Sequence, residues 1–371
     1  MFWICGAPGA GKSATSWALF EELGDERVAV AYVDIDQLGM LYPEPDDDPE
    51  RYRLKVDALN AVLPGYAAAG VEVLVVSGIV DPDAGAGLAS LFPTASVTFC
   101  LLNVDETTLR DRIAERGWDA ADADEAVAEA RSLLAAPFVD SVIDTTGNDL
   151  AAVVARVRPL VGLRDSAAVP AVDQGARPSP TAVPDLLVVS GPRACGASTV
   201  GFNLARSRWN SGCPTGFIDL QQLSFVRRPG ADGCSDTSLG IANLAAMREL
   251  FGSRGADLVV ASAHLHTAAE HTALRRTAPR RPAVIARLRD TESALEEHIR
   301  ARSQGSEARL AGDDLVGATE ARQAHVLAVA VSEQRVLEAD QAEDFVVDVS
   351  GRTPDEVTSE LQQHVARRTN G

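Results

Sequence analysis

Short apolar runs alternate with amphipathic stretches along the first 161 residues of the chain. The runs are continuous, as expected of strands that are buried on both faces of a sheet. The apolar runs are Phe2–Cys5, Val28–Val33, Val71–Ser77, Val97–Leu102 and Phe138–Asp144. Between them, Leu54–Ala69 and Glu106–Arg116 have the apolar spacing of helices. Buried strands that alternate with helices predict a parallel sheet with crossover helices, which is a doubly wound α/β fold.

The same pattern occurs a second time in the second half of the chain. Residues 162–184 are rich in Pro, Ala and Ser and lack periodicity, which predicts a linker. Beyond it, Gly6 has a counterpart in Gly191 and Asp34 in Asp219, both at a spacing of 185 residues. The spacing becomes 186 further on, where Ile113 matches Ile299. We therefore expect two tandem α/β domains, at 1–161 and 185–371.

A phosphate-binding loop follows the first apolar run. Residues 6–13 match the pattern GxxxxGK[ST] in full and lie between a strand and a helix, which is the context that a P-loop requires. Its backbone N–H groups and the helix N-terminus attract phosphate, while the lysine reaches the β- and γ-phosphates and the serine ligates Mg²⁺. The residues expected to hold the nucleotide are Gly6, Ala7, Pro8, Gly9, Ala10, Gly11, Lys12, Ser13 and Ala14.

Two carboxylates follow the second apolar run. Asp34 and Asp36 alternate with Ile35, so on a continuing strand they point to the same face, at the edge where such sheets bind ligands. We expect both to contact the substrate, with Asp36 as the base for the acceptor hydroxyl and Asp34, with Ser13, on Mg²⁺. The reverse assignment stays open, as does a simple role of the strand-end aspartate as a helix cap.

The second copy lacks two of these groups. Residues 191–198 keep the loop pattern, but Ala197 stands where the first copy has Lys12, and Gln221 stands in place of Asp36. A glutamine cannot accept a proton at neutral pH, and without the lysine a triphosphate loses its main cation. Arg193 inside the loop is the one candidate substitute. We interpret residues 185–371 as a degenerate, non-catalytic copy.

The loop, the aspartate pair, the segment Leu-Arg-Asp-Arg-Ile-Ala-Glu-Arg at 109–116 and Ile-Asp-Thr-Thr-Gly at 143–147 resemble P-loop small-molecule kinases. Gluconate kinase, shikimate kinase, adenylylsulfate kinase, chloramphenicol phosphotransferase and the zeta toxins share this layout. The resemblance implies two P-loop NTPase domains and the use of ATP and Mg²⁺. It also implies that Arg112 stacks on adenine, that Arg116 acts from a lid on the transferring phosphate, and that Thr145 borders the adenine. The expected lid, Gly117–Glu129, departs from the family because it is acidic and has no arginine.

Two further residues are candidates for the acceptor side. Asp48 and Pro49 have the pattern of a helix start, and Arg53 on that helix is the candidate clamp for an anionic substrate group. Gly78 ends the third strand at the same rim and allows a ligand to approach the backbone closely.

Composition narrows the possible partners. The formal net charge of −19 opposes binding to nucleic acid and to anionic membranes, because the mean field repels phosphate. The five cysteines form no CxxC pair, which favours reduced thiols and the cytoplasm, and the histidines complete no metal-binding pattern. No apolar run has the length of a membrane span.

The sequence thus predicts ATP-dependent phosphotransfer to a small-molecule hydroxyl, by a kinase whose second copy packs on the first, pairs between chains or binds a partner. One alternative is a nucleotide-binding switch or sensor without metabolite kinase activity, and another is a toxin-like kinase acting on a nucleotide sugar. A polynucleotide kinase is disfavoured by the acidity of the chain.

Overall fold

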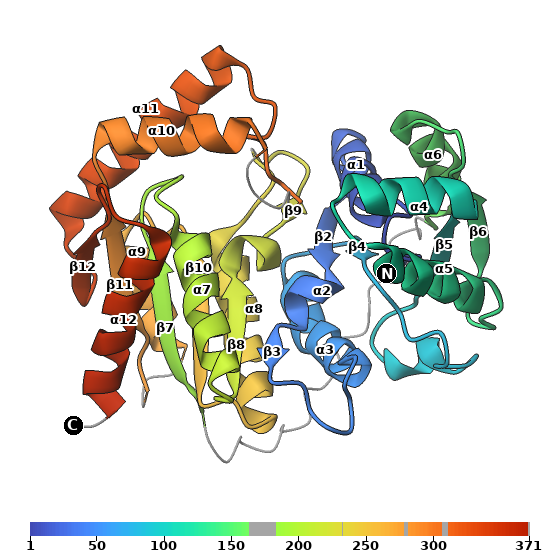
Figure 1. Cartoon of the computed structure of the whole chain (residues 1–371), viewed down its shortest axis with the longest axis horizontal. Coiled ribbons are helices and arrows are strands. Elements are labelled where there is room, and N and C mark those ends of the chain that lie inside the picture. Colours follow the sequence, from blue (N-terminus) through green and yellow to red (C-terminus); the bar gives the residue numbers. More distant parts are fainter. Residues whose placement is uncertain (163–182, 232, 278–280, 306–310, 370–371) are drawn as a thin grey trace. The chain divides into compact units, whose positions relative to one another are not determined.

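The computed structural model describes residues 1–162, 183–231, 233–277, 281–305 and 311–369 (Figure 1). The expected linker at 162–184 lies almost wholly outside these residues. The chain forms two compact units. The first contains residues 1–39, 50–178 and 225–235, and the second contains 40–49, 179–224 and 236–371.

The first unit is built on a six-stranded sheet. Its strand order is β6-β5-β1-β4-β2-β9, and all pairs are parallel except β2 with β9. The strands are β1 (Phe2–Cys5), β2 (Val30–Asp34), β4 (Val73–Ser77), β5 (Thr98–Asn103), β6 (Ser141–Asp144) and β9 (Val226–Arg227). Every residue of β1 is buried, because this strand lies in the middle of the sheet.

Helices connect the strands of the first unit. They are α1 (Lys12–Asp25), α2 (Ile35–Leu38), α3 (Tyr52–Ala68), α4 (Glu106–Glu115), α5 (Ala120–Leu134) and α6 (Leu150–Val157), with 3₁₀ turns at Leu88–Leu91 and Arg158–Leu160. Helix α1 packs beside α6 and α4 packs beside α5 (Figure 1). The ring of Trp3 packs on the buried rings of Phe92 and Phe99, at centroid distances of 5.8 and 5.5 Å.

The second unit has a sheet of the same kind, in the order β12-β11-β7-β10-β8-β3. Its strands are β3 (Leu41–Tyr42), β7 (Asp185–Ser190), β8 (Thr215–Asp219), β10 (Leu258–Ala263), β11 (Val284–Arg289) and β12 (Phe345–Asp348). Its helices are α7 (Ala197–Asn210), α8 (Thr237–Ser253), α9 (Ala268–Arg276), α10 (Glu292–Ser303), α11 (Glu320–Asp340) and α12 (Pro354–Thr369), with a 3₁₀ turn at Leu220–Leu223. Both units are therefore mixed α/β with sheets dominated by parallel pairs, as the alternating pattern predicts.

Each sheet ends in a strand taken from the other half of the sequence. Strand β9 adds antiparallel to β2, and β3 adds antiparallel to β8. In the first unit Phe225, which precedes β9, is fully buried and packs against Trp17 at a centroid distance of 4.9 Å. The contiguous boundaries expected at 1–161 and 185–371 do not include this exchange of segments.

The helix signal at Asp48 and Pro49 is misleading. Helix α3 begins at Tyr52, and Arg51 before it has a left-handed backbone with φ of 58°. Residues 40–49 belong to the second unit, and Asp48 closes a turn there by donating its N–H to the carbonyl of Pro45. Among the described residues, no helix is both long and apolar enough to span a membrane.

Candidate active site

The phosphate loop joins β1 to α1 and has the conformation that its glycines predict. Gly9 and Gly11 have φ values of 86° and 96°, a left-handed region that other residues rarely adopt. A Cβ on Gly6 would lie 2.5 Å from the carbonyl oxygen of Leu102, so only glycine fits where the loop crosses β5. Helix α1 starts directly after Gly11, and its free N–H groups face the same concave loop.

Lys12 folds back over this loop. Its Nζ donates a 3.0 Å hydrogen bond to the carbonyl of Ala7. Burial lowers the pKa of the lysine, and the carboxylates of Asp36, Glu129 and Asp34 act in the opposite direction. Among the described residues this half-buried cation donates its side-chain hydrogen bond to a neutral carbonyl, so it gains strongly from an anionic ligand, and the loop suits a phosphate chain.

A serine and an aspartate lie together beside the loop. The Oγ of Ser13 is 3.4 Å from Oδ2 of Asp34, and the Oγ of Ser77, at the end of β4, is 3.5 Å from that of Ser13. Burial and, to a smaller extent, the charge of Asp36 raise the pKa of Asp34 to about 6. The hydrogen bond from the backbone N–H of Asp36 lowers this pKa but does not offset the rise. A divalent cation here would offset the free-energy cost of keeping the buried carboxylate of Asp34 ionised. Hydroxyl and carboxylate oxygens are also the ligands that Mg²⁺ prefers. The residues present therefore fit Mg²⁺.

Asp36 does not continue the strand, contrary to the expectation from alternation. Strand β2 ends at Asp34, whose Oδ1 accepts the N–H of Asp36 at 2.9 Å and caps α2. This cap turns the chain, so that Asp36 reaches the site from the first turn of α2. Asp34 thus has the capping role that the sequence left open, in addition to its position beside Ser13.

Lys55 is the partner of Asp36. Its Nζ lies 2.8 Å from Oδ1 of Asp36, and its side chain is only 8% exposed. A Cβ on Gly39 would lie 2.9 Å from Cγ of Lys55, which shows how closely the lysine stem is packed. Sequence reasoning missed this residue, because three basic residues within one helical turn gave no reason to choose it over Arg53. The structure leaves Arg53 exposed.

Gly78 lies where the sequence predicts. A Cβ there would collide with Cγ2 of Ile35 and approach Oδ2 of Asp36 to 3.4 Å, and the residue has φ of 134°. The end of β4 therefore packs directly against the start of α2, and the glycine brings the aspartate to the rim of the sheet.

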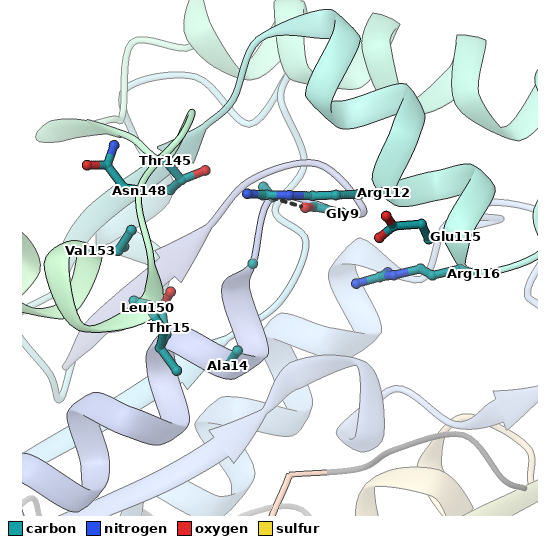
Figure 2. Close-up of a pocket in the computed structure, with 12 residues that line it drawn as sticks. Gly9, Ala14, Thr15, Arg112, Glu115, Arg116, Thr145, Asn148, Leu150 and Val153 are labelled. Atoms are coloured by element: carbon teal, nitrogen blue, oxygen red, sulfur yellow. Dashed lines mark hydrogen bonds between the residues drawn. The ribbon is translucent and has the colours of Figure 1, made fainter. Parts of the chain in front are cut away.

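A pocket of about 470 Å³ opens beside the phosphate loop (Figure 2). Arg112 on α4 and Arg116, directly after that helix, reach into it, and Nη1 of Arg112 donates a 3.1 Å hydrogen bond to the carbonyl of Gly9. Thr145, expected at the adenine, lies on the opposite wall. The remaining lining residues include Ala10, Gly11, Ala14, Thr15, Glu115, Asn148, Leu150 and Val153. An arginine plane facing apolar side chains suits a flat base next to a phosphate loop.

Sequence reasoning missed Asn148, Leu150 and Glu129. The first two line the pocket from the turn before α6 and its first residue, where nothing in the sequence marks them. Glu129 lies on α5, in the stretch expected to be an acidic lid, and one of its carboxylate oxygens is buried. An acidic residue in a helix rich in charged residues is ordinarily solvated, so the sequence around Glu129 does not indicate a buried carboxylate.

The second unit keeps the loop backbone but not its charge. Gly196 has φ of 85° before α7, and Oγ of Ser198 is 2.8 Å from Oδ2 of Asp219. The side chain of Ala197 carries no cation. The backbone N–H of Arg193 is already bonded to Oε2 of Glu333, at 2.8 Å.

The side chain of Arg193 faces an acidic residue of its own unit. Its Nη1 lies 3.6 Å from Oδ2 of Asp314. The described residues hold no group of three or more His, Cys, Asp or Glu that could bind a metal ion. The arginine that sequence analysis named as a substitute cation is therefore paired within the unit.

A family model described as an AAA domain matches residues 1–137. No curated protein matches the chain. A solved gluconokinase from Sinorhizobium meliloti 1021 is 22% identical, with a TM-score of 0.34, over 50% of this chain and 93% of that one. The tunicamycin resistance protein of Deinococcus radiodurans is 13% identical, with a TM-score of 0.34, over 49% and 95%.

Shikimate kinase from Bacteroides thetaiotaomicron is a third similar structure. It is 12% identical, with a TM-score of 0.29, over 49% of this chain and 98% of that one. The family match ends at residue 137 and so falls within the first half of the chain. Together with the geometry of residues 6–13, it supports a P-loop nucleotide-binding fold for the first unit.

Proposed function

We propose that the first unit is a kinase that transfers the γ-phosphoryl group of ATP to a hydroxyl group of a small molecule. The observation that carries this proposal is the position of Asp36, a carboxylate tied to Lys55 beside an intact phosphate loop. A carboxylate for Mg²⁺ is common to all such proteins, but a second one in addition to Asp34 can accept the proton of an acceptor hydroxyl, which a protein that only senses a nucleotide does not need.

In this proposal the phosphate loop and Lys12 hold the triphosphate, and Arg112 and Thr145 border the base. The oxygen of the acceptor hydroxyl attacks the γ-phosphorus, the bond to the β–γ bridging oxygen breaks, and ADP leaves. Asp36 takes the proton of the hydroxyl, and Arg116 stabilises charge on the transferring group. Ser13 and Asp34 would hold Mg²⁺, which neutralises charge on the phosphates when it is bound. Arg53 remains a proposed contact for the outer end of the acceptor, and Gly78 for its close approach to the sheet.

We also propose that the second unit arose by duplication and does not catalyse. The matching strand orders of the two sheets and the paired spacing of Gly6 with Gly191 support a common origin. The missing amine at Ala197, the amide of Gln221 and the carboxylate of Glu333 on the loop support the loss of chemistry. The five free cysteines suit a reducing compartment, and we propose the cytoplasm.

Calorimetric titration with MgATP tests both proposals, with the intact protein beside Lys12→Ala and Ala197→Lys. We expect one site per chain, lost in Lys12→Ala. A site that survives in Lys12→Ala would mean that the second unit binds nucleotide. Binding without phosphotransfer to any acceptor would instead favour a nucleotide switch.

A further inference from the structure

Glu129 has a buried carboxylate oxygen that finds no hydrogen-bond partner in the described part of the chain. Helix α5 packs through Ala123, Ala126 and Val127 against the core formed with Ile113 of α4. Glu129 lies on the same helix, and its Oε1 is buried with no hydrogen-bond partner among the described residues. Leaving such an oxygen unpaired is costly, so this position favours a ligand that donates a hydrogen bond.

The charges that act on Glu129 include those of the phosphate loop and of the Asp36–Lys55 pair. Burial raises the pKa of Glu129, Asp36 raises it further, and Lys12 and Lys55 lower it. The same glutamate opposes the pKa shift of Lys12. Glu129 on α5 therefore lies within electrostatic range of the groups that, in the proposed reaction, hold the γ-phosphate and the acceptor hydroxyl.

Carboxylates surround the acceptor side. Burial raises the pKa of Tyr52, at the start of α3, and the carboxylates of Glu129, Glu50, Asp81 and Asp36 raise it further. These four groups therefore act on the same small region. An anionic acceptor would meet their combined repulsion there.

The cations near this region are already engaged. Lys55 is bound to Asp36 at 2.8 Å and lies 5.6 Å from the ring of Tyr52. Arg51 and Arg53 each have an interaction partner. Lys12 is taken by the phosphates once ATP binds. The local charge thus favours a cationic acceptor over a neutral one and a neutral one over an acid.

We propose that Glu129 determines acceptor specificity by binding a protonated amine, so that the acceptor is a hydroxyl compound of the amino alcohol or amino sugar class. This inference rests on the proposed kinase function and names its substrate class. The ammonium group donates to the orphaned oxygen of Glu129 while the hydroxyl faces Asp36. A carboxylate in the place of the amine is excluded by repulsion.

Matched acceptors that differ only in charge test this inference. We would measure transfer of radiolabelled γ-phosphate from MgATP to glucosamine, glucose and glucuronate, and to serinol, glycerol and glycerate. The variant is Glu129→Gln, and the control is Glu125→Gln, which removes an exposed charge one turn earlier on α5. We expect the amines to be the best acceptors. Glu129→Gln should lower their kcat/KM about 10- to 100-fold and spare MgATP binding, whereas Glu125→Gln should have little effect.

The outcomes separate this inference from the kinase function. Preferred transfer to glucose, glycerol or an acid, or equal effects of Glu129→Gln and Glu125→Gln, would overturn the inference and leave the kinase function in place. Bound MgATP with no product from any acceptor would count against the kinase function and against this inference with it. If Glu129→Gln fails to fold, Glu129→Ala serves instead, and it should remove the preference for the amines over glucose and glycerol.

Discussion

Asp34→Asn should make the ligand-free protein more stable at neutral pH. The change removes a charge but keeps an oxygen that can accept the N–H of Asp36 and cap α2. The pKa of Asp34 is raised from 3.8 to about 6 in the folded protein, because burial and the charge of Asp36 oppose its ionisation. The ionised carboxylate therefore costs stability that the amide would not cost.

The size of the effect follows from this shift. A rise of about two pKa units corresponds to about 3 kcal/mol, and the remaining exposure of the side chain reduces this to about 2 kcal/mol. A group with a raised pKa binds its proton more tightly when folded, so the free energy of unfolding falls as the pH rises from about 4 to about 6. The gain in Asp34→Asn should thus be absent near pH 4 and complete at pH 7.

Thermal and urea denaturation of the nucleotide-free protein at pH 4 and pH 7.5 measure this gain. A gain of about 2 kcal/mol raises the midpoint by about 4–8 °C for a unit of this size. Asp219→Asn in the second unit is the matched control, and we expect no gain there because Asp219 holds a 2.8 Å bond from Ser198. Equal stability of variant and wild type at pH 7.5, or the same gain at both pH values, would refute the reasoning.

Three other changes test separate parts of the structure. Lys55→Met removes the ammonium group that lies 2.8 Å from Oδ1 of Asp36, and it should lower the free energy of unfolding by about 1 kcal/mol. It should also lower the rate of phosphotransfer at least tenfold without weakening MgATP binding, and an unchanged rate would contradict this. Phe225→Ala should destabilise the first unit by about 3 kcal/mol in scanning calorimetry, since it empties the space against Trp17; a transition that does not move would argue against the exchange of segments. Arg112→Ala should weaken MgATP binding about tenfold in calorimetric titration and leave the melting temperature unchanged; equal affinity would remove Arg112 from the nucleotide site.

Local sequence was enough for the strands, the phosphate loop and most helices of the site. The loop of residues 6–13 depends on glycine backbones and on the helix that follows, and these interactions close within a few residues. Alternation was a poorer guide at Asp36. Both a strand and a capped helix are compatible with the segment after Asp34, and the hydrogen bond to the N–H of Asp36 decides for the helix.

The pattern of apolar and polar residues could not predict contacts between residues that are distant in the sequence. Lys55 is 19 positions after Asp36 and looks like the other basic residues of its helix until α3 packs against Gly39. Glu129 looks like a solvated charge until α5 packs on α4. The exchange of β3 and β9 was hidden for another reason. Two similar halves present similar strand edges, so the short strands have no local preference for one sheet.

The amino-acid sequence alone thus specified the backbone of the phosphate loop, the alternation of strands with helices and the alanine at position 197 where the P-loop pattern has lysine, because each depends on residue types or on neighbours in the chain. Only the tertiary structure decided that Asp36 pairs with Lys55, that Glu129 has a buried carboxylate oxygen and that each sheet includes a strand from the other half of the sequence. These outcomes depend on which helix and strand faces pack against each other. The residues next to either partner in the sequence do not indicate such a contact.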